Sequence, residues 1–108
     1  MWWNRLAAPS VVLIAMSCAA AGPAACPPDI FTKDGKHRLV NASLFDGPPS
    51  HMTDLIPAPA GVVDRWDIDR IDPYLVCRFA GTAQTVTIHE KGAKVCEVGD
   101  KPFRAGCR

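Results

Sequence analysis

The stretch YLVCRFAGTAQTVTIHEKGAKVC, residues 74–96, decides the fold of this chain. Apolar and polar residues alternate along it with the period of two that is typical of half-buried β-strands. Two runs interrupt the alternation, residues 80–83 and 91–93, and each contains a glycine. Such runs mark turns between strands. The pattern therefore predicts three short antiparallel strands with a cysteine near each end of the stretch.

The register of these strands follows from which residues must face the core, because a slip of one residue sends every side chain to the wrong face. With residues 80–83 as the loop, Cys77 lies opposite Val86 and Leu75 lies opposite Ile88. This register gathers the apolar residues on one face, and it predicts that Cys77 points into the core.

The neighbouring strands are expected to continue the same sheet. A turn at Asp72-Pro73 would set Trp66 opposite Cys77, and a turn at residues 91–93 would set Cys96 opposite Ile88. Both cysteines then face the core. We therefore predict an all-β fold, a small antiparallel meander, sandwich or partly open barrel, stapled by disulfides.

Earlier parts of the chain fit the same fold class. HRLVNASLF (37–45) and VVDRWDID (62–69) alternate as strands do, and SHMTDLI (50–56) could form one helical turn capped by Ser50. The first of these strands should stop at Asp46-Gly47-Pro48-Pro49, since proline cannot donate to a sheet ladder. No internal repeat divides the chain.

The N-terminus reads as a secretory signal peptide. One positive charge, Arg5, precedes an apolar run over residues 6–16 and a run of small residues over 17–22, which is the order that such peptides follow. The run is too short for a membrane span, which needs about 20 apolar residues. An Ala-x-Ala pattern allows cleavage after Ala21, and small residues also allow it nearer Ala25. We expect residues 1–25 to be removed and residues 26–108 to form a single periplasmic or secreted domain without a transmembrane segment.

A lipid anchor is the alternative for the N-terminus. Ala15-Met16-Ser17-Cys18 resembles a degenerate lipobox, although leucine would be usual where Ala15 stands. Lipidation at Cys18 would hold the domain in the envelope by a short tether, and it would account for the odd fifth cysteine.

The other four cysteines, Cys26, Cys77, Cys96 and Cys107, are expected to form two disulfides, since an even count in a small exported domain is typical of a disulfide framework. The pairing Cys77–Cys96 is favoured because both face the core, and Cys26–Cys107 follows by elimination. A flat meander would separate the first pair by about 9.6 Å, beyond the reach of about 7 Å. That pairing therefore requires the sheet to curl or the strand at 94–98 to leave it.

Charge and motifs exclude several functions. Arg5 is the only charged residue before residue 26, so of 12 basic and 11 acidic side chains eleven of each remain in the domain. This balance provides no footprint for nucleic acid. The cysteine spacing matches no zinc pattern. Residues 64–72 hold four aspartates, but a calcium loop starting at Asp67 would lack the required glycine. We expect no metal, no cofactor and no catalytic residue.

The chain is therefore expected to be a non-catalytic binding or inhibitor-like module, with a small periplasmic hydrolase or metal-dependent enzyme as the alternative. Its partner would be an envelope protein, a peptide or a glycan. The candidate binding loop is FDGPPSHM, in which two prolines lower the ordering cost of association. Its contributing residues are Phe45, Asp46, Gly47, Pro48, Pro49, His51 and Met52. Alternatively, this loop only covers one end of the core.

The chain also resembles a family of small secreted proteobacterial proteins. The shared features are a signal peptide ending before Cys-Pro-Pro and the motifs SLFDGPP, DLIPAP, WDI, YLVCRFAGT and KVCEV, which span most of residues 26–98. The resemblance implies an envelope location and an important role for Cys77 and Cys96, but no active site. Periplasmic lysozyme inhibitors are also disulfide-stapled β-domains, yet this chain lacks their Ser-Gly-x-x-Tyr loop.

Overall fold

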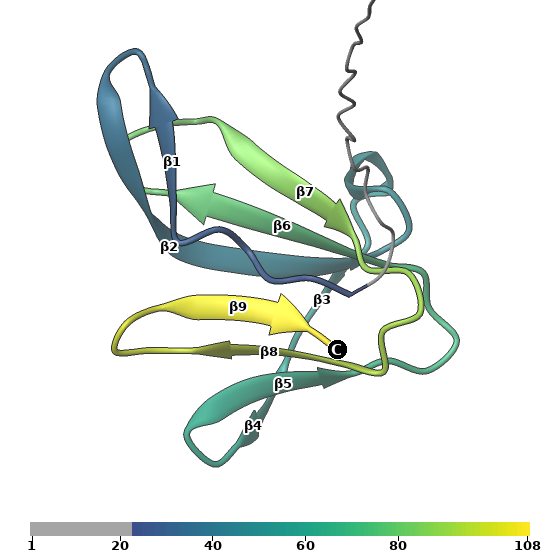
Figure 1. Ribbon diagram of the computed structural model, residues 1–108. Coiled ribbons are helices and arrows are strands. Elements are labelled where there is room, and N and C mark those ends of the chain that lie inside the picture. The colour runs from purple at the N-terminus through teal and green to yellow at the C-terminus, as the bar shows by residue number, and fades with distance from the viewer. Residues whose placement is uncertain (1–22) are drawn as a thin grey trace, which may run out of the picture.

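The structure, a computed structural model, describes residues 23–108 (Figure 1). It consists of strands and one short 3₁₀ turn, η1, which spans Pro49–His51. The strands are β1 (Asp29–Thr32), β2 (Gly35–Asp46), β3 (Asp54–Leu55), β4 (Ala58–Ala60), β5 (Val63–Asp67), β6 (Pro73–Phe79), β7 (Thr85–His89), β8 (Val95–Gly99) and β9 (Arg104–Cys107). The predicted all-β class is confirmed.

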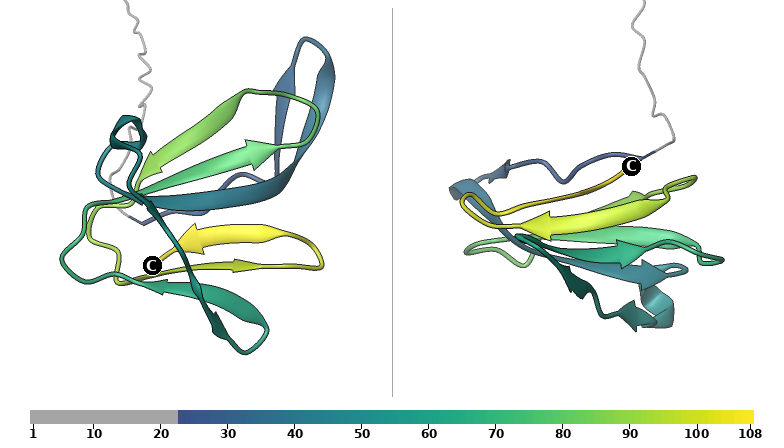
Figure 2. Two further views of the ribbon diagram at one scale, coloured as in Figure 1. Left: turned by 180° about the vertical axis from the view of Figure 1, so that it is seen from behind. Right: turned by 90° about the horizontal axis from the view of Figure 1, so that it is seen from below.

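The strands form two antiparallel sheets that lie one over the other (Figures 1 and 2). The first sheet has the order β1-β2-β6-β7, and β3 pairs with the far half of β2. The second has the order β4-β5-β8-β9. The chain passes from the first sheet to the second between β3 and β4, returns between β5 and β6, and leaves again between β7 and β8.

The hydrophobic core lies between the sheets, because the inward residues of both sheets belong to one cluster. It includes Cys26, Leu39, Ala42, Leu44, Trp66, Leu75, Cys77, Phe79, Cys96 and Ala105. Trp66 is the largest of these, and its indole N–H donates to the carbonyl of Leu55 at 3.0 Å. The ring is therefore buried without an unpaired donor.

The predicted register of the β6–β7 hairpin is confirmed. Cys77 pairs with Val86 and Leu75 pairs with Ile88, so the apolar side chains of both strands face inward. This pairing is local, and the positions of the glycine turn and the apolar residues are sufficient to define it.

The pairings predicted for the flanking strands are wrong. Trp66 lies opposite Cys96 rather than Cys77, because β5 pairs with β8. Cys77 instead has Ala42 of β2 on its other side. The cause is residues 68–72, which do not form a hairpin. Arg70 has a positive φ of 62° in this connection, and the chain crosses to the other sheet.

The predicted disulfide pairing is also wrong. The bonds are Cys26–Cys77, with Cα atoms 5.8 Å apart, and Cys96–Cys107, with Cα atoms 3.9 Å apart. Strand β8 does leave the β6–β7 sheet, but it moves to the opposite layer, where β9 brings Cys107 directly opposite Cys96. The observed pairing places Cys26, close to the start of the described chain, in the core, where it is buried.

The N-terminal segment enters the core because it adds to the edge of β9. The amide of Cys26 donates to Ala105 at 2.9 Å, and the amide of Cys107 donates to Ala24 at 3.2 Å. Ala25 forms a bridge with Gly106. Figure 1 shows this segment running from the first sheet toward β9. It therefore closes one sheet edge, and Cys26 joins it to Cys77 in the other sheet.

The predicted lipidation at Cys18 and residues 1–22 of the predicted signal peptide lie outside the described residues. Residues 23–25 of that predicted peptide are described, and Ala24 and Ala25 bond to β9. Within residues 23–108, no helix has the length and apolar character needed to cross a membrane.

Candidate functional site

The outward side of the first sheet forms a continuous surface, which we call the open face. On β6 the inward positions are Leu75, Cys77 and Phe79, so the alternate residues Tyr74, Val76 and Arg78 point outward. A hollow of about 420 Å³ lies on this face beside η1. Its lining residues are Phe45, Pro49, Met52, Asp54, Val76, Arg78, Thr85 and Thr87.

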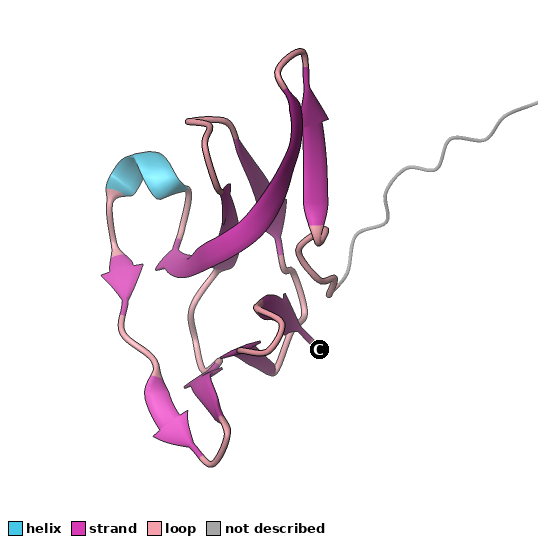
Figure 3. Cartoon of the chain, turned by 90° about the vertical axis from the view of Figure 1, so that its left-hand side faces the viewer, coloured by secondary structure: helices cyan, strands magenta, loops and turns pink. Residues whose placement is uncertain are grey.

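The predicted binding loop forms one wall of this hollow, at the end of the sheet where Figure 3 shows the helical turn. Phe45, Pro49 and Met52 line it, and Met52 is 81% exposed. His51 lies elsewhere, near Gly47, where a Cβ would be 3.4 Å from the imidazole Nδ1. The structure thus brings part of the predicted loop together with strand residues, and its role in binding remains a proposal.

The loop is held in place by its own backbone. The amide of Asp46 donates to the carbonyl of Thr53 at 3.0 Å, and the amide of Met52 donates to Pro49 at 2.9 Å. Gly47 has a φ of 87°, a left-handed conformation that favours glycine, and its amide donates to Asp72 at 2.7 Å. The Asp46 carboxylate in turn accepts the amide of Asp72 at 2.9 Å. Because these bonds fix the loop, little conformational entropy remains to be lost on binding.

The predicted helical turn over residues 50–56 is shorter than expected. The 3₁₀ turn ends at His51, Ser50 makes no capping bond, and β3 begins at Asp54. Met52 follows the turn in a left-handed conformation with a φ of 60°. This sharp reversal leaves its side chain in solvent beside the hollow.

The strand residues of the hollow were not predicted from the sequence. Val76 is the apolar floor and is itself buried, and Arg78 donates to the hydroxyl of Ser43 at 2.7 Å. The alternation that placed Leu75 and Cys77 inward also places Val76 and Arg78 outward, so the signal was present. What the sequence lacks is the pairing of β6 with β2, which brings these residues beside Phe45.

An aromatic pair ends the open face. The rings of Tyr74 and His89 stack with centroids 4.1 Å apart and an angle of 6° between planes. His89 also contacts the carboxylate of Asp72 at 2.6 Å. His89 lies on the outer face of β7, where Tyr74 and Asp72 hold its ring. The contact connects β7 with the segment that anchors the loop.

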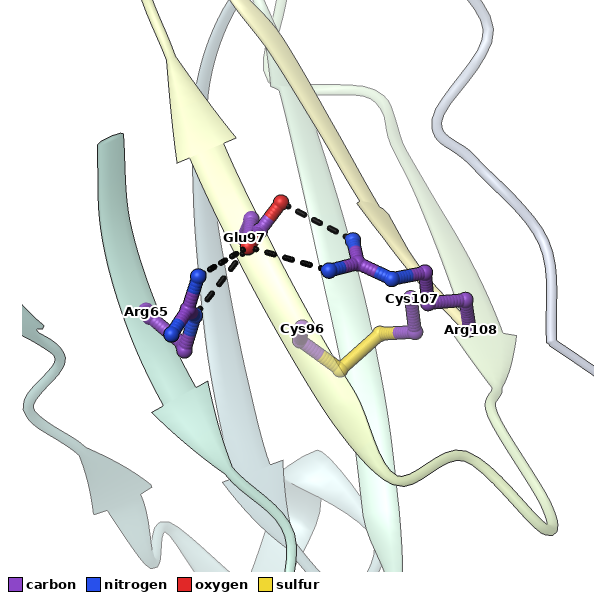
Figure 4. A network of polar contacts seen from close by, with 5 residues as sticks. All are labelled: Arg65, Cys96, Glu97, Cys107 and Arg108. Atoms are coloured by element: carbon purple, nitrogen blue, oxygen red, sulfur yellow. Dashed lines mark hydrogen bonds and ion pairs between the residues drawn. A yellow bond between two sulfur atoms is a disulfide. The ribbon is translucent and has the colours of Figure 1, made fainter. Parts of the chain in front are cut away.

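The outward side of the second sheet, which we call the charged face, is different (Figure 4). Glu97 of β8 accepts hydrogen bonds from Arg65 of β5, at 3.0 and 3.1 Å, and from Arg108, at 3.0 and 3.4 Å. These two guanidinium groups lower the pKa of Glu97, with the bond from Arg108 as the largest cause. Arg65 lies among the aspartates of residues 64–72, yet its ion pair is with Glu97 of β8.

One glutamate is fully buried. Glu90 follows β7, and its Oε1 accepts the amide of Ala24 at 2.6 Å. Within residues 23–108, its Oε2 has no hydrogen-bond partner. Burial raises the pKa of Glu90, and the bond from Ala24 partly offsets this. No group of three or more histidine, cysteine or acidic side chains in the described part of the chain is arranged to hold a metal ion.

Two antiparallel sheets, two disulfides and a loop fixed by backbone hydrogen bonds make up a small disulfide-stapled β-domain. Residues 33–108 match the family model described as "Type VI secretion system Tli immunity protein", and the chain belongs to this family. The match supports the resemblance to a small proteobacterial family that the sequence motifs indicated. Membership indicates an inhibitor-like module with a protein partner. No curated protein and no solved structure matches the chain.

Proposed function

We propose that this protein is an envelope immunity protein that binds a toxin delivered by type VI secretion and blocks it without catalysis. The observation that carries the proposal is the family match, which covers residues 33–108 and therefore all strands after β1. The residues matched include the loop, the hollow and the disulfide partners Cys77, Cys96 and Cys107.

We further propose that the toxin binds at the open face, over the hollow beside loop 45–52. Three observations support this surface. Met52 is exposed beside the apolar floor that Val76 forms, so a partner that fills the hollow can bury Met52. The loop is rigid, which lowers the entropic cost of binding. On the charged face, by contrast, Glu97 is already neutralised by two arginines.

The proposed location is the periplasm, with export by the N-terminal segment and with anchoring through Cys18 as the variant form. Because Ala24 and Ala25 bond to β9, we propose cleavage after Ala21 rather than after Ala25. Two disulfides support an oxidising compartment. Mass spectrometry of the protein from envelope fractions distinguishes these forms. A chain that starts near residue 22 supports release, a diacylglyceryl group on Cys18 supports anchoring, and a retained Met1 in the cytoplasm contradicts both.

Growth rescue tests the function. Each type VI toxin of the producing bacterium is expressed with an export signal in a sensitive strain, with or without the full chain. We expect the chain to restore growth against one toxin, and a variant with residues 48–52 replaced by Gly-Ser to fail at equal abundance. Val62→Ser, at the exposed β4–β5 turn, is the matched control and should protect fully. Protection against no toxin contradicts the proposal, as does turnover of an envelope substrate by the purified chain.

A further inference from the structure

Strand β7 differs from the other sheet edges in having a free and unprotected side. It pairs with β6, and in the part of the chain that the structure describes no backbone group bonds to it from the other side. Its sequence, TVTIH, contains no proline and no acidic or basic side chain other than His89. Proteins usually block such edges with charge, proline, a bulge or a covering segment, because a bare edge accepts another strand.

The other edges carry those devices. Strand β3 has only two residues, one of them Asp54, and strand β4 has three residues, one of them Pro59. The edge of β9 is covered by the N-terminal segment through Ala25. Strand β1 has four residues, begins with Asp29 and follows two prolines, Pro27 and Pro28. Strand β7 thus lacks the protection that the other edges have. It is also the edge that borders the hollow, because Thr85 and Thr87 line that hollow.

The register shows which backbone groups of β7 are free. The amide of Glu90 donates to Pro73 at 2.8 Å, so these two residues form a hydrogen-bonded pair of the antiparallel ladder. Such pairs alternate along the strands. Val86 and Ile88 therefore direct their amides and carbonyls toward β6. The amides and carbonyls of Thr85, Thr87 and His89 point to the free edge instead.

The side chains of β7 define what an added strand would look like. Val86 and Ile88 point toward the core but are only half-buried, since no strand lies beyond them. A neighbouring strand with an apolar residue at every second position would cover both. Its alternate residues would lie beside Thr85 and Thr87 and extend over the hollow.

We propose that β7 is the edge at which an extended segment of the toxin, apolar at every second position, adds to the first sheet as a further strand. This inference rests on the proposed function and specifies its mode of recognition. Backbone hydrogen bonds from Thr85, Thr87 and His89 provide affinity, and the hollow beside loop 45–52 provides selectivity for the flanking side chains. A second copy of this chain is the competing occupant of the edge.

Thr87→Pro tests the proposal because it removes one free-edge amide and no hydrogen bond to β6. Thr87→Ala is the matched control, since it removes the same side chain and keeps the amide. We expect the proline variant to bind the toxin identified by growth rescue about tenfold to a hundredfold more weakly than the alanine variant does. Thermal unfolding checks that both variants are folded. Equal affinity of the two variants overturns the proposal.

Amide hydrogen exchange in the complex tests the same point without a substitution. The amides of Thr85, Thr87 and His89 should become protected, while those of Val86 and Ile88, already bonded to β6, should change little. Exchange at the first three that is unaltered by the toxin contradicts strand addition. A self-association abolished by Thr87→Pro, with toxin binding intact, would assign the edge to a second copy and overturn the proposal.

A library of random ten-residue peptides displayed on phage separates this proposal from the proposed function. Selected peptides with alternating apolar residues that bind Thr87→Ala but not Thr87→Pro support the edge even where no toxin is neutralised. Peptides that bind both variants alike count against it even where growth rescue succeeds.

Discussion

The outward faces of the two sheets are built in opposite ways. On the charged face, Glu97 is satisfied by Arg65 and Arg108, and both edges of its sheet are blocked, by Pro59 and by Ala25. On the open face, a rigid loop and a hollow border the bare strand β7. The comparison indicates that one layer closes the fold while the other is available for a partner.

Removal of the disulfides should have the largest effect on the unfolding free energy. One disulfide joins the two sheets, and the other lies within the second sheet. Cys26–Cys77 joins the sheets and closes 51 residues, whereas Cys96–Cys107 lies within the second sheet and closes 11. In the chain-entropy model the first contributes about 4 kcal/mol and the second about 3 kcal/mol. We expect the double variant Cys26→Ser/Cys77→Ser to lose more unfolding free energy in urea than Cys96→Ser/Cys107→Ser. A larger loss from the second pair would show that the charged layer, rather than the link between layers, limits stability.

Two exposed apolar residues, one in each sheet layer, test the assignment of the partner surface. Met52 is 81% exposed beside the hollow, and Val62 is 92% exposed at the β4–β5 turn. Met52→Asp should weaken toxin binding by about 1.5–3 kcal/mol, which is the value of burying such a side chain. Val62→Asp should leave affinity unchanged, and neither should alter stability much. Calorimetry with the toxin checks both; equal losses would reject the open face as the binding surface.

Two glycines of the charged layer test how its edge is closed. A Cβ on Gly106 would lie 3.0 Å from the Cα and Cβ of Ala25, whose neighbours are hydrogen-bonded to β9. A Cβ on Gly99 would lie 2.9 Å from the guanidinium carbon of Arg104, which can rotate into solvent. Gly106→Ala should therefore cost about 1–3 kcal/mol of unfolding free energy. Gly99→Ala should cost less, and the reverse order in urea denaturation would contradict this account of the edge.

The smallest expected effects on unfolding free energy come from two glutamates, whose contributions change with pH in opposite directions. The pKa of Glu90 is raised on folding, so native Glu90 binds more protons than unfolded Glu90 above the usual pKa, and its contribution to stability falls as pH rises through that window. The pKa of Glu97 is lowered, so its contribution is present at neutral pH and is lost as pH falls below the usual value.

Substitution by glutamine separates the two. Relative to the native protein, Glu90→Gln should gain stability near pH 7, and the gain should shrink on acidification. Glu97→Gln should be less stable near pH 7, and that deficit should shrink on acidification. Urea unfolding at several pH values measures both differences. Two differences with the same sign at pH 7 would contradict the contrast between a buried and an ion-paired carboxylate.

The parts of the fold that the sequence predicted are those set by neighbours in the chain. The β6–β7 register follows from the glycine turn at Gly81 and the alternation around it. The pairing of β5 with β8 does not, because residues 68–72 resemble a hairpin turn in sequence although they cross between sheets. The predicted disulfide pairing was wrong because it too depends on contacts between distant parts of the chain. Cys26 reaches Cys77 through the addition of residues 24–26 to β9.

In the candidate site, too, the sequence predicted the parts set by neighbouring residues and missed those set by pairing between distant strands. Proline and glycine identified loop 45–52 from the sequence, because they mark an ordered turn whatever lies around it. Val76 and Arg78 were missed because their position beside the loop depends on β2 pairing with β6, a contact between residues more than 30 positions apart. The free edge of β7 likewise depends on knowing which strand does not pair with it.

The connectivity of the disulfides has a consequence for biogenesis. Along residues 23–108 each cysteine is bonded to an adjacent one in sequence order, first Cys26 with Cys77 and then Cys96 with Cys107. A chain that enters an oxidising compartment N-terminus first presents these thiols in the same order. An oxidase that joins each emerging thiol to the one still unpaired would produce the native bonds directly, so maturation would require an oxidant but no disulfide isomerase.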